Sequence, residues 1–304
     1  MGRMPDCFTR FAFGLRLFGL GLFALSTLPA GAETPTSIVK DAPPSAWQEI
    51  QPRDLLVLTL HNGRVVVIQL APAFAPRHVQ NIAALSKARW WDGGDITRVQ
   101  DGYVTQWAGN PSRKALPATV QAVLPPEYER PATGLSLTPL NHPDAYAAQT
   151  GFTSGWPVGT DGHTVWLAHC YGMVGAGRDM PPNTGDGTEL YTVIGQAPRQ
   201  LDRNIALVGR VLSGMDALTA LPRGTGDMGF YRTPAEFTSI QSARLAIDLP
   251  SSARPRFEVM KTDSPSFVQY LHARANRTDP FYVRPAGGVD VCNAPVPTRP
   301  SSPN

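Results

Sequence analysis

The sequence predicts a mostly β fold in which a small number of short helices accompany a larger set of strands. An apolar hairpin spans residues 55–70 and turns at Asn62-Gly63, a dipeptide typical of two-residue β-hairpin loops. Residues 239–247 alternate in the manner of a strand with one buried face. Short apolar runs at 164–167 and 205–211 are typical of buried strands. Before residue 250, by contrast, helical spacing is confined to two short stretches.

The first helix is expected after the hairpin. Proline suits the first helical turn, and Pro76 is followed by Val79, Ile82 and Leu85, which fall on one helical face. The second helix is expected at 214–218, between the strand at 205–211 and a stop formed by Pro222 and Gly224. Both helices are short enough to cover a sheet without forming a layer of their own.

The first 32 residues predict a cleavable secretory signal. Three arginines precede an apolar core at 17–28, and Ala30-Gly31-Ala32 matches the small-residue pattern of a cleavage site. The core is too short to favour a stable membrane span, although an anchor left uncleaved is the alternative. We therefore expect a periplasmic or secreted protein of 272 residues, with no stable membrane insertion after processing.

The charge of the chain argues against nucleic acid as a partner. The formal charge falls from +3 to +1 on processing, because the signal carries three arginines and one aspartate. There are only four lysines, and the arginines are scattered along the chain. Binding to a phosphate backbone needs a basic patch, so we expect no nucleic-acid partner.

Two cysteines, Cys170 and Cys292, remain after processing. In an oxidising compartment an even pair predicts a disulfide, which here would tie the C-terminal tail to the domain. The alternative is a buried free thiol at Cys170, which follows a predicted strand, and an exposed thiol at Cys292.

The chain divides into a main domain and additions. We expect the domain at 53–250, after a flexible, polar lead-in at 33–52 and before a C-terminal extension at 251–304 that contains a helix near 267–275. Within the domain, eight prolines interrupt residues 111–162, which predicts an enlarged loop. This insertion is either functional or a surface decoration.

Five segments carry ordered motifs. Residues 75–82 read like Ala-Pro-x-x-Val-x-Asn-Phe, and residues 96–106 like an aromatic-His-Arg, a short turn, Gly-Phe-Met, one residue and Gln. Residues 172–178 are similar to Gly-Thr-Ile-Ala-Met-Ala-Arg, and residues 183–191 to Asn-x-x-x-Gly-Ser-Gln-Phe-Phe. Residues 208–215 match a closing Phe-Gly-x-Val and Gly-Met. In this order the motifs resemble the cyclophilins, which are peptidyl-prolyl cis-trans isomerases, over residues 55 to 250.

The resemblance implies a closed antiparallel cyclophilin-like β-barrel capped by two helices, here with the enlarged loop and the C-terminal extension. It also implies isomerisation of X-Pro bonds in proline-containing polypeptide clients. No bond is broken in this reaction, so no cofactor, nucleophile or metal is needed.

The same resemblance assigns the site. Arg98 takes the position of the catalytic arginine, and Gln106 that of the glutamine that orients it. The substrate-binding positions correspond to Tyr103, Val104, Gly177, Glu189, Tyr191 and Leu201. The alternative is an ordinary surface arginine beside the core aromatics of a barrel.

Five departures from the family pattern bear on the expected activity. Thr97 stands for a histidine, Trp107 for a glycine, Glu189 for a glutamine, Gln200 for a tryptophan and Ile205 for a histidine. These changes predict a slower reaction and weaker cyclosporin binding. They also leave open a second function, that of a catalytically weak cyclophilin-like chaperone or a module that binds proline segments.

Other signals predict no further site. His169 and Cys170 are adjacent and would point to opposite faces of a strand, so we expect no metal centre there with His163. The Gly-x-Gly-x-x-Gly at 224–229 follows a predicted helix, whereas a dinucleotide site needs a strand before it.

Overall fold

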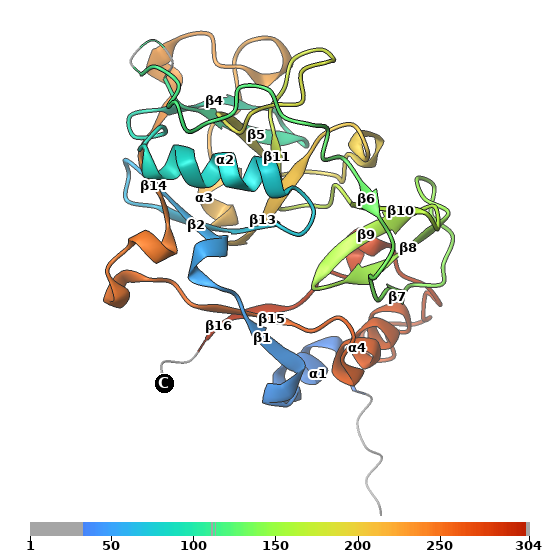
Figure 1. The fold of residues 1–304 in the computed structure, drawn as a ribbon. Helices are drawn as coiled ribbons and strands as arrows, with labels where there is room; N and C mark the ends of the chain where they lie inside the picture. Colours follow the sequence, from blue (N-terminus) through green and yellow to red (C-terminus); the bar gives the residue numbers. More distant parts are fainter. Residues whose placement is uncertain (1–32, 111, 113, 302–304) are drawn as a thin grey trace, which may run out of the picture. The chain divides into compact units, whose positions relative to one another are not determined.

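The computed structural model describes residues 33–110, 112 and 114–301, and eight of its strands close into an antiparallel barrel (Figure 1). The strand order is β11-β12-β5-β4-β14-β2-β3-β13, and the pairing of β11 with β13 completes the ring. The predicted closed barrel is confirmed. Its strands are β2 (Leu55–Leu60), β3 (Val65–Leu70), β4 (Asp95–Val99), β5 (Val104–Ala108), β11 (Met173–Ala176), β12 (Glu189–Val193), β13 (Leu207–Ser213) and β14 (Thr238–Leu245).

Two helices pack their apolar faces into the core of the barrel. Helix α2 (Pro76–Lys87) begins at the proline, as predicted, and buries Val79, Ile82 and Leu85 among the strand side chains. Helix α3 (Met215–Thr219) contributes two more buried apolar residues. None of the described helices is long and apolar enough to span a membrane.

The insertion at 111–162 is more ordered than the enlarged loop predicted from its prolines. It supplies four strands of a second sheet with the order β6-β10-β9-β8-β7, drawn in green in Figure 1. Pro131 and Pro139 lie in the two edge strands, where a missing N–H breaks no interior ladder. The predicted strand at 164–167 joins this sheet and not the barrel. The strands are β6 (Arg130–Pro131), β7 (Thr138–Pro139), β8 (Gln149–Thr153), β9 (Trp156–Thr160) and β10 (Thr164–Leu167).

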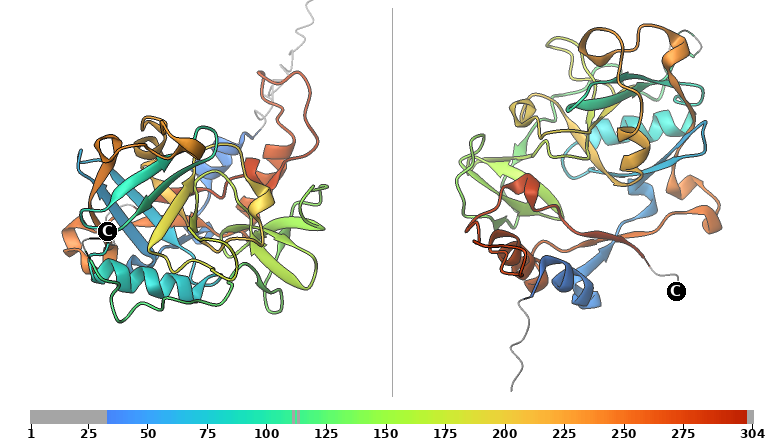
Figure 2. Two further views of the ribbon diagram at one scale, coloured as in Figure 1. Left: turned by 90° about the horizontal axis from the view of Figure 1, so that it is seen from above. Right: turned by 180° about the vertical axis from the view of Figure 1, so that it is seen from behind.

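The lead-in at 33–52, expected to be flexible, is ordered by pairing with the C-terminal extension. Strand β1 pairs antiparallel with β15, whose other edge pairs with β16 (Figure 2). Helix α1 contacts helix α4, which covers the helix expected near 267–275. The elements are α1 (Pro35–Asp41), β1 (Trp47–Glu49), β15 (Phe257–Met260), α4 (Pro265–Ala275) and β16 (Thr298–Pro300).

A second apolar core explains why these added segments are ordered. It combines Trp47 of β1, Phe152 of β8 and Phe267 of α4, so the lead-in, the insertion and the extension all bury side chains in it. The rings of Phe152 and Phe267 meet edge to face at 5.0 Å between centroids. Residues of the barrel strands, such as Leu55 and Val67, complete this core, so it joins the added segments to the barrel.

A disulfide joins Cys170 to Cys292, with 5.0 Å between the Cα atoms and a sequence separation of 122. Cys170 follows β10 and is buried in the second core. Cys292 lies in a short 3₁₀ helix, Val291–Asn293, whose Val291 is buried in the same core. The extension is therefore held by burial as well as by the covalent bridge.

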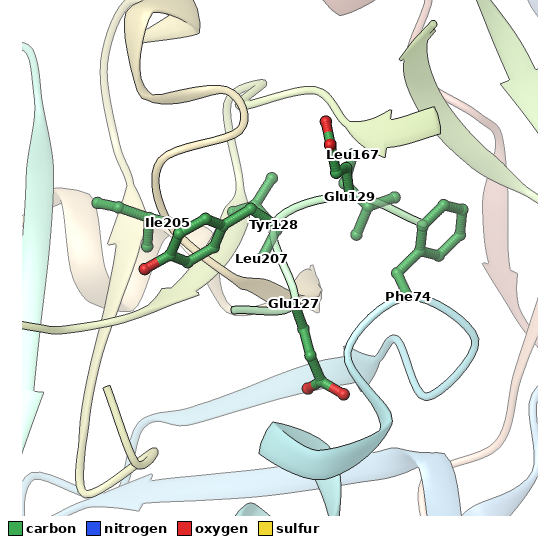
Figure 3. A pocket seen from close by; sticks show the side chains of 7 residues that line it. All are labelled: Phe74, Glu127, Tyr128, Glu129, Leu167, Ile205 and Leu207. Atoms are coloured by element: carbon green, nitrogen blue, oxygen red, sulfur yellow. The ribbon is translucent and has the colours of Figure 1, made fainter. Parts of the chain in front are cut away.

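Glu127 of the insertion caps helix α2. Its carboxylate accepts the backbone N–H groups of Arg77 and His78, at 2.9 and 3.0 Å, and contacts His78 Nδ1 at 2.7 Å. Figure 3 shows Glu127 pointing toward this helix and away from Tyr128. Burial raises the pKa of Glu127, but the hydrogen bonds from His78 and from the two N–H groups outweigh it, so the pKa is lowered.

Replacing Glu127 by glutamine is expected to reduce the free energy of unfolding at neutral pH by about 1–3 kcal/mol, because a charged cap is lost. Since folding lowers the pKa of Glu127, the wild-type advantage is complete above its ordinary value of 4.5 and disappears as the pH falls through the folded value. Urea unfolding of both proteins should therefore converge in acid. A difference in stability that stays constant with pH would contradict this role.

Candidate active site

Arg98, Gln106 and Tyr191 lie side by side on three neighbouring barrel strands. Arg98 of β4 is opposite Gln106 of β5, and Gln106 is opposite Tyr191 of β12. Directly opposite residues share a face of a sheet, so the three side chains point the same way. Leu190, next to Tyr191, belongs to the barrel core, which places this shared face on the outside of the barrel.

The guanidinium of Arg98 is held by three hydrogen bonds. Its Nη1 donates to Gln106 Oε1 at 3.0 Å, its Nε donates to the Met228 carbonyl at 2.7 Å, and its Nη2 donates to Gln100 Oε1. A bulge in the β4–β5 pairing between Ile96 and Arg98 re-aims the side chain. Because a guanidinium has five N–H groups, two remain without a partner among the described residues and can donate to a ligand.

Two aromatic rings flank the same charge. The Cζ atom of Arg98 lies 5.6 Å from the ring centre of Tyr103 and 5.0 Å from that of Phe230. Partial burial lowers the pKa of Arg98, while Tyr103 and Glu189 act in the opposite direction. The group nevertheless remains a cation, as arginine does throughout the range in which proteins are folded.

A cavity of about 100 Å³ adjoins the guanidinium. Its apolar side includes Tyr103, Val104, Tyr191 and Ile205, which pack in a cluster with Val193, separate from the barrel core. The structure thus brings seven of the eight predicted catalytic and binding residues to one cavity. The lining residues are Arg98, Tyr103, Val104, Gln106, Gly177, Arg178, Tyr191, Leu201 and Ile205.

Glu189 is the predicted site residue that does not line the cavity. It begins β12, and its side chain lies against Gly177, 3.0 Å from where a Cβ would stand. Burial raises the pKa of its carboxyl group, as does Asp179, while Arg98 opposes the rise. The structure therefore places Glu189 beside Gly177 and outside the lining of the cavity.

Five residues of the site were not among the predicted catalytic and binding residues. Arg178 and Ile205 line the cavity, and Gln100, Met228 and Phe230 contact Arg98. Gln100 had a usable signal, because it is two residues from Arg98 and such residues share a strand face. Phe230 had none, since its segment comes from far along the chain.

A second hollow lies close by, between the insertion and the barrel, and shares Ile205 with the cavity at Arg98 (Figure 3). Its volume is only about 10 Å³, which is room for about one water molecule. It offers no space for a peptide side chain.

Gly175 makes room for the tyrosine ring at the cavity. It is opposite Tyr191, and a Cβ at this position would stand 2.3 Å from both Cζ and the hydroxyl oxygen of that tyrosine. We expect Gly175→Ala to lower the free energy of unfolding by about 1–3 kcal/mol, because the buried ring must move. Urea unfolding measures the loss.

Gly177→Ala is the matched control for this change. Its Cβ would meet the flexible side chain of Glu189 at 3.0 Å, which can shift, so the loss should be smaller. Equal losses in the two variants would show that Tyr191 is not confined by the space at Gly175.

Comparison with known proteins agrees with this geometry. Residues 55–244 match the model of the family described as cyclophilin type peptidyl-prolyl cis-trans isomerase/CLD. The crystal structure of the cyclophilin AquaCyp293 from Hirschia baltica is similar, with a TM-score of 0.67 and 26% identity, over 88% of this chain and 97% of that one. The chain belongs to the family of cyclophilin-type peptidyl-prolyl cis-trans isomerases, as the order of its motifs predicted.

Another similar structure is a cyclophilin-type peptidyl-prolyl cis-trans isomerase from Cryptosporidium parvum, solved in the presence of the dipeptide Ala-Pro. It has 12% identity and a TM-score of 0.39, over 63% of this chain and 98% of that one. No curated protein sequence matches the chain.

Proposed function

We propose that the protein isomerises X-Pro bonds of exported polypeptides, and that Arg98 stabilises the twisted amide of the transition state. One observation carries the proposal: Gln106 holds the Arg98 guanidinium at a cavity with an apolar side, where two of its N–H groups have no partner among the described residues and can donate to a substrate.

Isomerisation of an X-Pro bond requires little more than this arrangement. Amide resonance imposes a barrier of about 18–20 kcal/mol on rotation about the X-Pro bond. When the amide twists, conjugation is lost and the proline nitrogen regains a lone pair that can accept an N–H from Arg98. A donor fixed in advance at an apolar site favours this state over the planar one.

The other residues of the cavity hold the substrate. Val104, Tyr191 and Leu201 provide apolar surface for the proline ring, and Tyr103 closes the side next to the guanidinium. At Gly177 the absence of a side chain lets the backbone of an extended peptide approach. The ring is thereby fixed, while the acyl side of the amide is free to rotate.

Two features support an exported setting. The disulfide between Cys170 and Cys292 is typical of an oxidising compartment. The signal expected at residues 1–32 lies outside the described residues and rests on the sequence alone. Exported protein should begin at Glu33 on N-terminal sequencing, and a product that keeps Met1 would contradict cleavage.

A protease-coupled assay on an Ala-Pro peptide tests the proposed activity. The uncatalysed reaction takes tens to hundreds of seconds, and we expect the purified protein to shorten this time in proportion to its concentration. A protein that binds the peptide without changing the rate would instead be the proline-binding module.

A further inference from the structure

Tyr191 faces two ways. Its ring lines the cavity beside Arg98, while its hydroxyl group lies 3.0 Å from Nε2 of His169, which is completely buried. The family motifs given above have phenylalanine at the position of Tyr191 and alanine at that of Gly175. This chain has both the extra hydroxyl group and the space that it needs.

Asp202 fixes the orientation of the histidine ring. Its Oδ1 accepts the backbone N–H of His169 at 2.9 Å and lies 2.9 Å from Nδ1. An ionised carboxylate only accepts, so Nδ1 carries a proton and Nε2 is left facing the tyrosine. Burial raises the pKa of Tyr191, which keeps its hydroxyl group protonated, and with a neutral imidazole it donates to Nε2.

The chain of contacts continues from Asp202 to the insertion. Arg199 donates from Nε to Asp202 Oδ2 at 2.5 Å, and from Nη1 and Nη2 to the two carboxylate oxygens of Asp144 at 3.1 and 3.2 Å. The side chains of Arg199, Asp202 and Asp144 are at most 5% exposed. Among side chains this buried, each group holds its neighbour in one geometry, because an unpaired charge would be costly.

We propose that His169 is a positioning residue for the isomerase reaction, which holds Tyr191 at the proline pocket, and that the insertion sets this geometry through Asp144 and Arg199. This rests on the function proposed above. It gives the insertion a role in the site that a surface decoration would not have.

Two substitutions of His169 separate its two contacts. In His169→Asn the amide nitrogen takes the place of Nδ1 and keeps the contact with Asp202, but the side chain is too short to reach Tyr191. In His169→Gln the longer side chain puts an amide near the place of Nε2. We expect His169→Asn to raise KM for an Ala-Pro peptide about fivefold with little change in kcat, and His169→Gln to recover most of the loss.

A second background tests whether the effect passes through the tyrosine. Tyr191→Phe removes the hydroxyl group, so His169→Asn should change KM no further in that variant. Asp144→Ala, at the far end of the chain of contacts, should raise KM less than His169→Asn does. A full additional effect of His169→Asn on Tyr191→Phe would overturn the assignment.

A spectroscopic signal decides the question independently of activity. In protein labelled with ¹³C at tyrosine Cζ, the Tyr191 resonance is identified by its loss in Tyr191→Phe. It should shift in His169→Asn and in Asp144→Ala and stay near its wild-type position in His169→Gln, with thermal unfolding still cooperative in each. An unchanged resonance in His169→Asn and Asp144→Ala would overturn the proposal. The expected shifts in these variants, together with a wild-type protein that does not isomerise the peptide, would overturn only the proposed function.

Discussion

Arg98→Ala is expected to lower kcat/KM for an Ala-Pro peptide at least about tenfold. The side chain supplies charged donors at the cavity, and the loss of one such donor to a transition state costs roughly 2–4 kcal/mol in comparable sites. Gln106, Gln100 and the Met228 carbonyl hold the guanidinium in place. Little of the interaction energy between Arg98 and the transition state is therefore lost to ordering the side chain. The protease-coupled assay gives the ratio directly.

Two further variants define the cause of that loss. Arg98→Lys keeps the charge but cannot make the three planar contacts, so it should remain well below the wild type. Arg64→Ala removes an arginine that pairs with Asp216 at the surface, and should leave kcat/KM unchanged. Equal kcat/KM for wild type and Arg98→Ala would reject the role of Arg98.

Removal of the disulfide is expected to cause the largest loss of stability. The bridge spans 122 residues, and in the simple chain model a loop of this size is worth about 4–5 kcal/mol of unfolded-state entropy, less any native strain. Cys170→Ala combined with Cys292→Ser should therefore shift the urea midpoint strongly downward. Reduced wild-type protein should behave like the double variant.

Thiol counting provides a separate check on the bridge. Protein cleaved at the proposed site and unfolded without reductant should show no free thiol, because that cleavage would remove Cys7. Two reactive thiols, or a double variant as stable as the wild type, would contradict the bridge as the anchor of the extension.

Several strands and the first helix of the barrel can be predicted from the sequence because their signals are local. The hairpin at 55–70 follows from its apolar strands and from Gly63, whose φ of +80° is favourable for glycine. Helix α2 follows from Pro76 and from the spacing of the apolar residues after it. Closure into a barrel, however, was expected only from the family resemblance, since no local pattern specifies it.

The added segments could not be predicted because their partners are remote in the chain. Trp47 is ordered by residues of β15 and β16, and Phe152 by Phe267 of α4. In a window of sequence, the lead-in is simply polar and rich in proline. Likewise, Pro131 and Pro139 predicted a loop, since nothing local shows that they fall in edge strands.

The candidate site also has a part that local spacing predicts and a part that depends on residues remote in the chain. Arg98 and Gln106 are eight residues apart and face each other across one hairpin, so the family spacing is enough to place them. Tyr191, by contrast, is contacted by His169, which belongs to a chain of contacts that includes Arg199. That chain ends at Asp144 in the insertion. These contacts depend on how the two sheets are packed, which the motifs do not describe.

Exchange spectroscopy by NMR tests most directly whether Arg98 stabilises the twisted amide or only binds the peptide. An Ala-Pro peptide at equilibrium with a small amount of wild-type protein should show exchange peaks between its cis and trans forms. With Arg98→Ala, shifts of the peptide signals should still report binding, while the exchange rate should fall at least about tenfold. Exchange equally fast with both proteins would contradict the proposed mechanism.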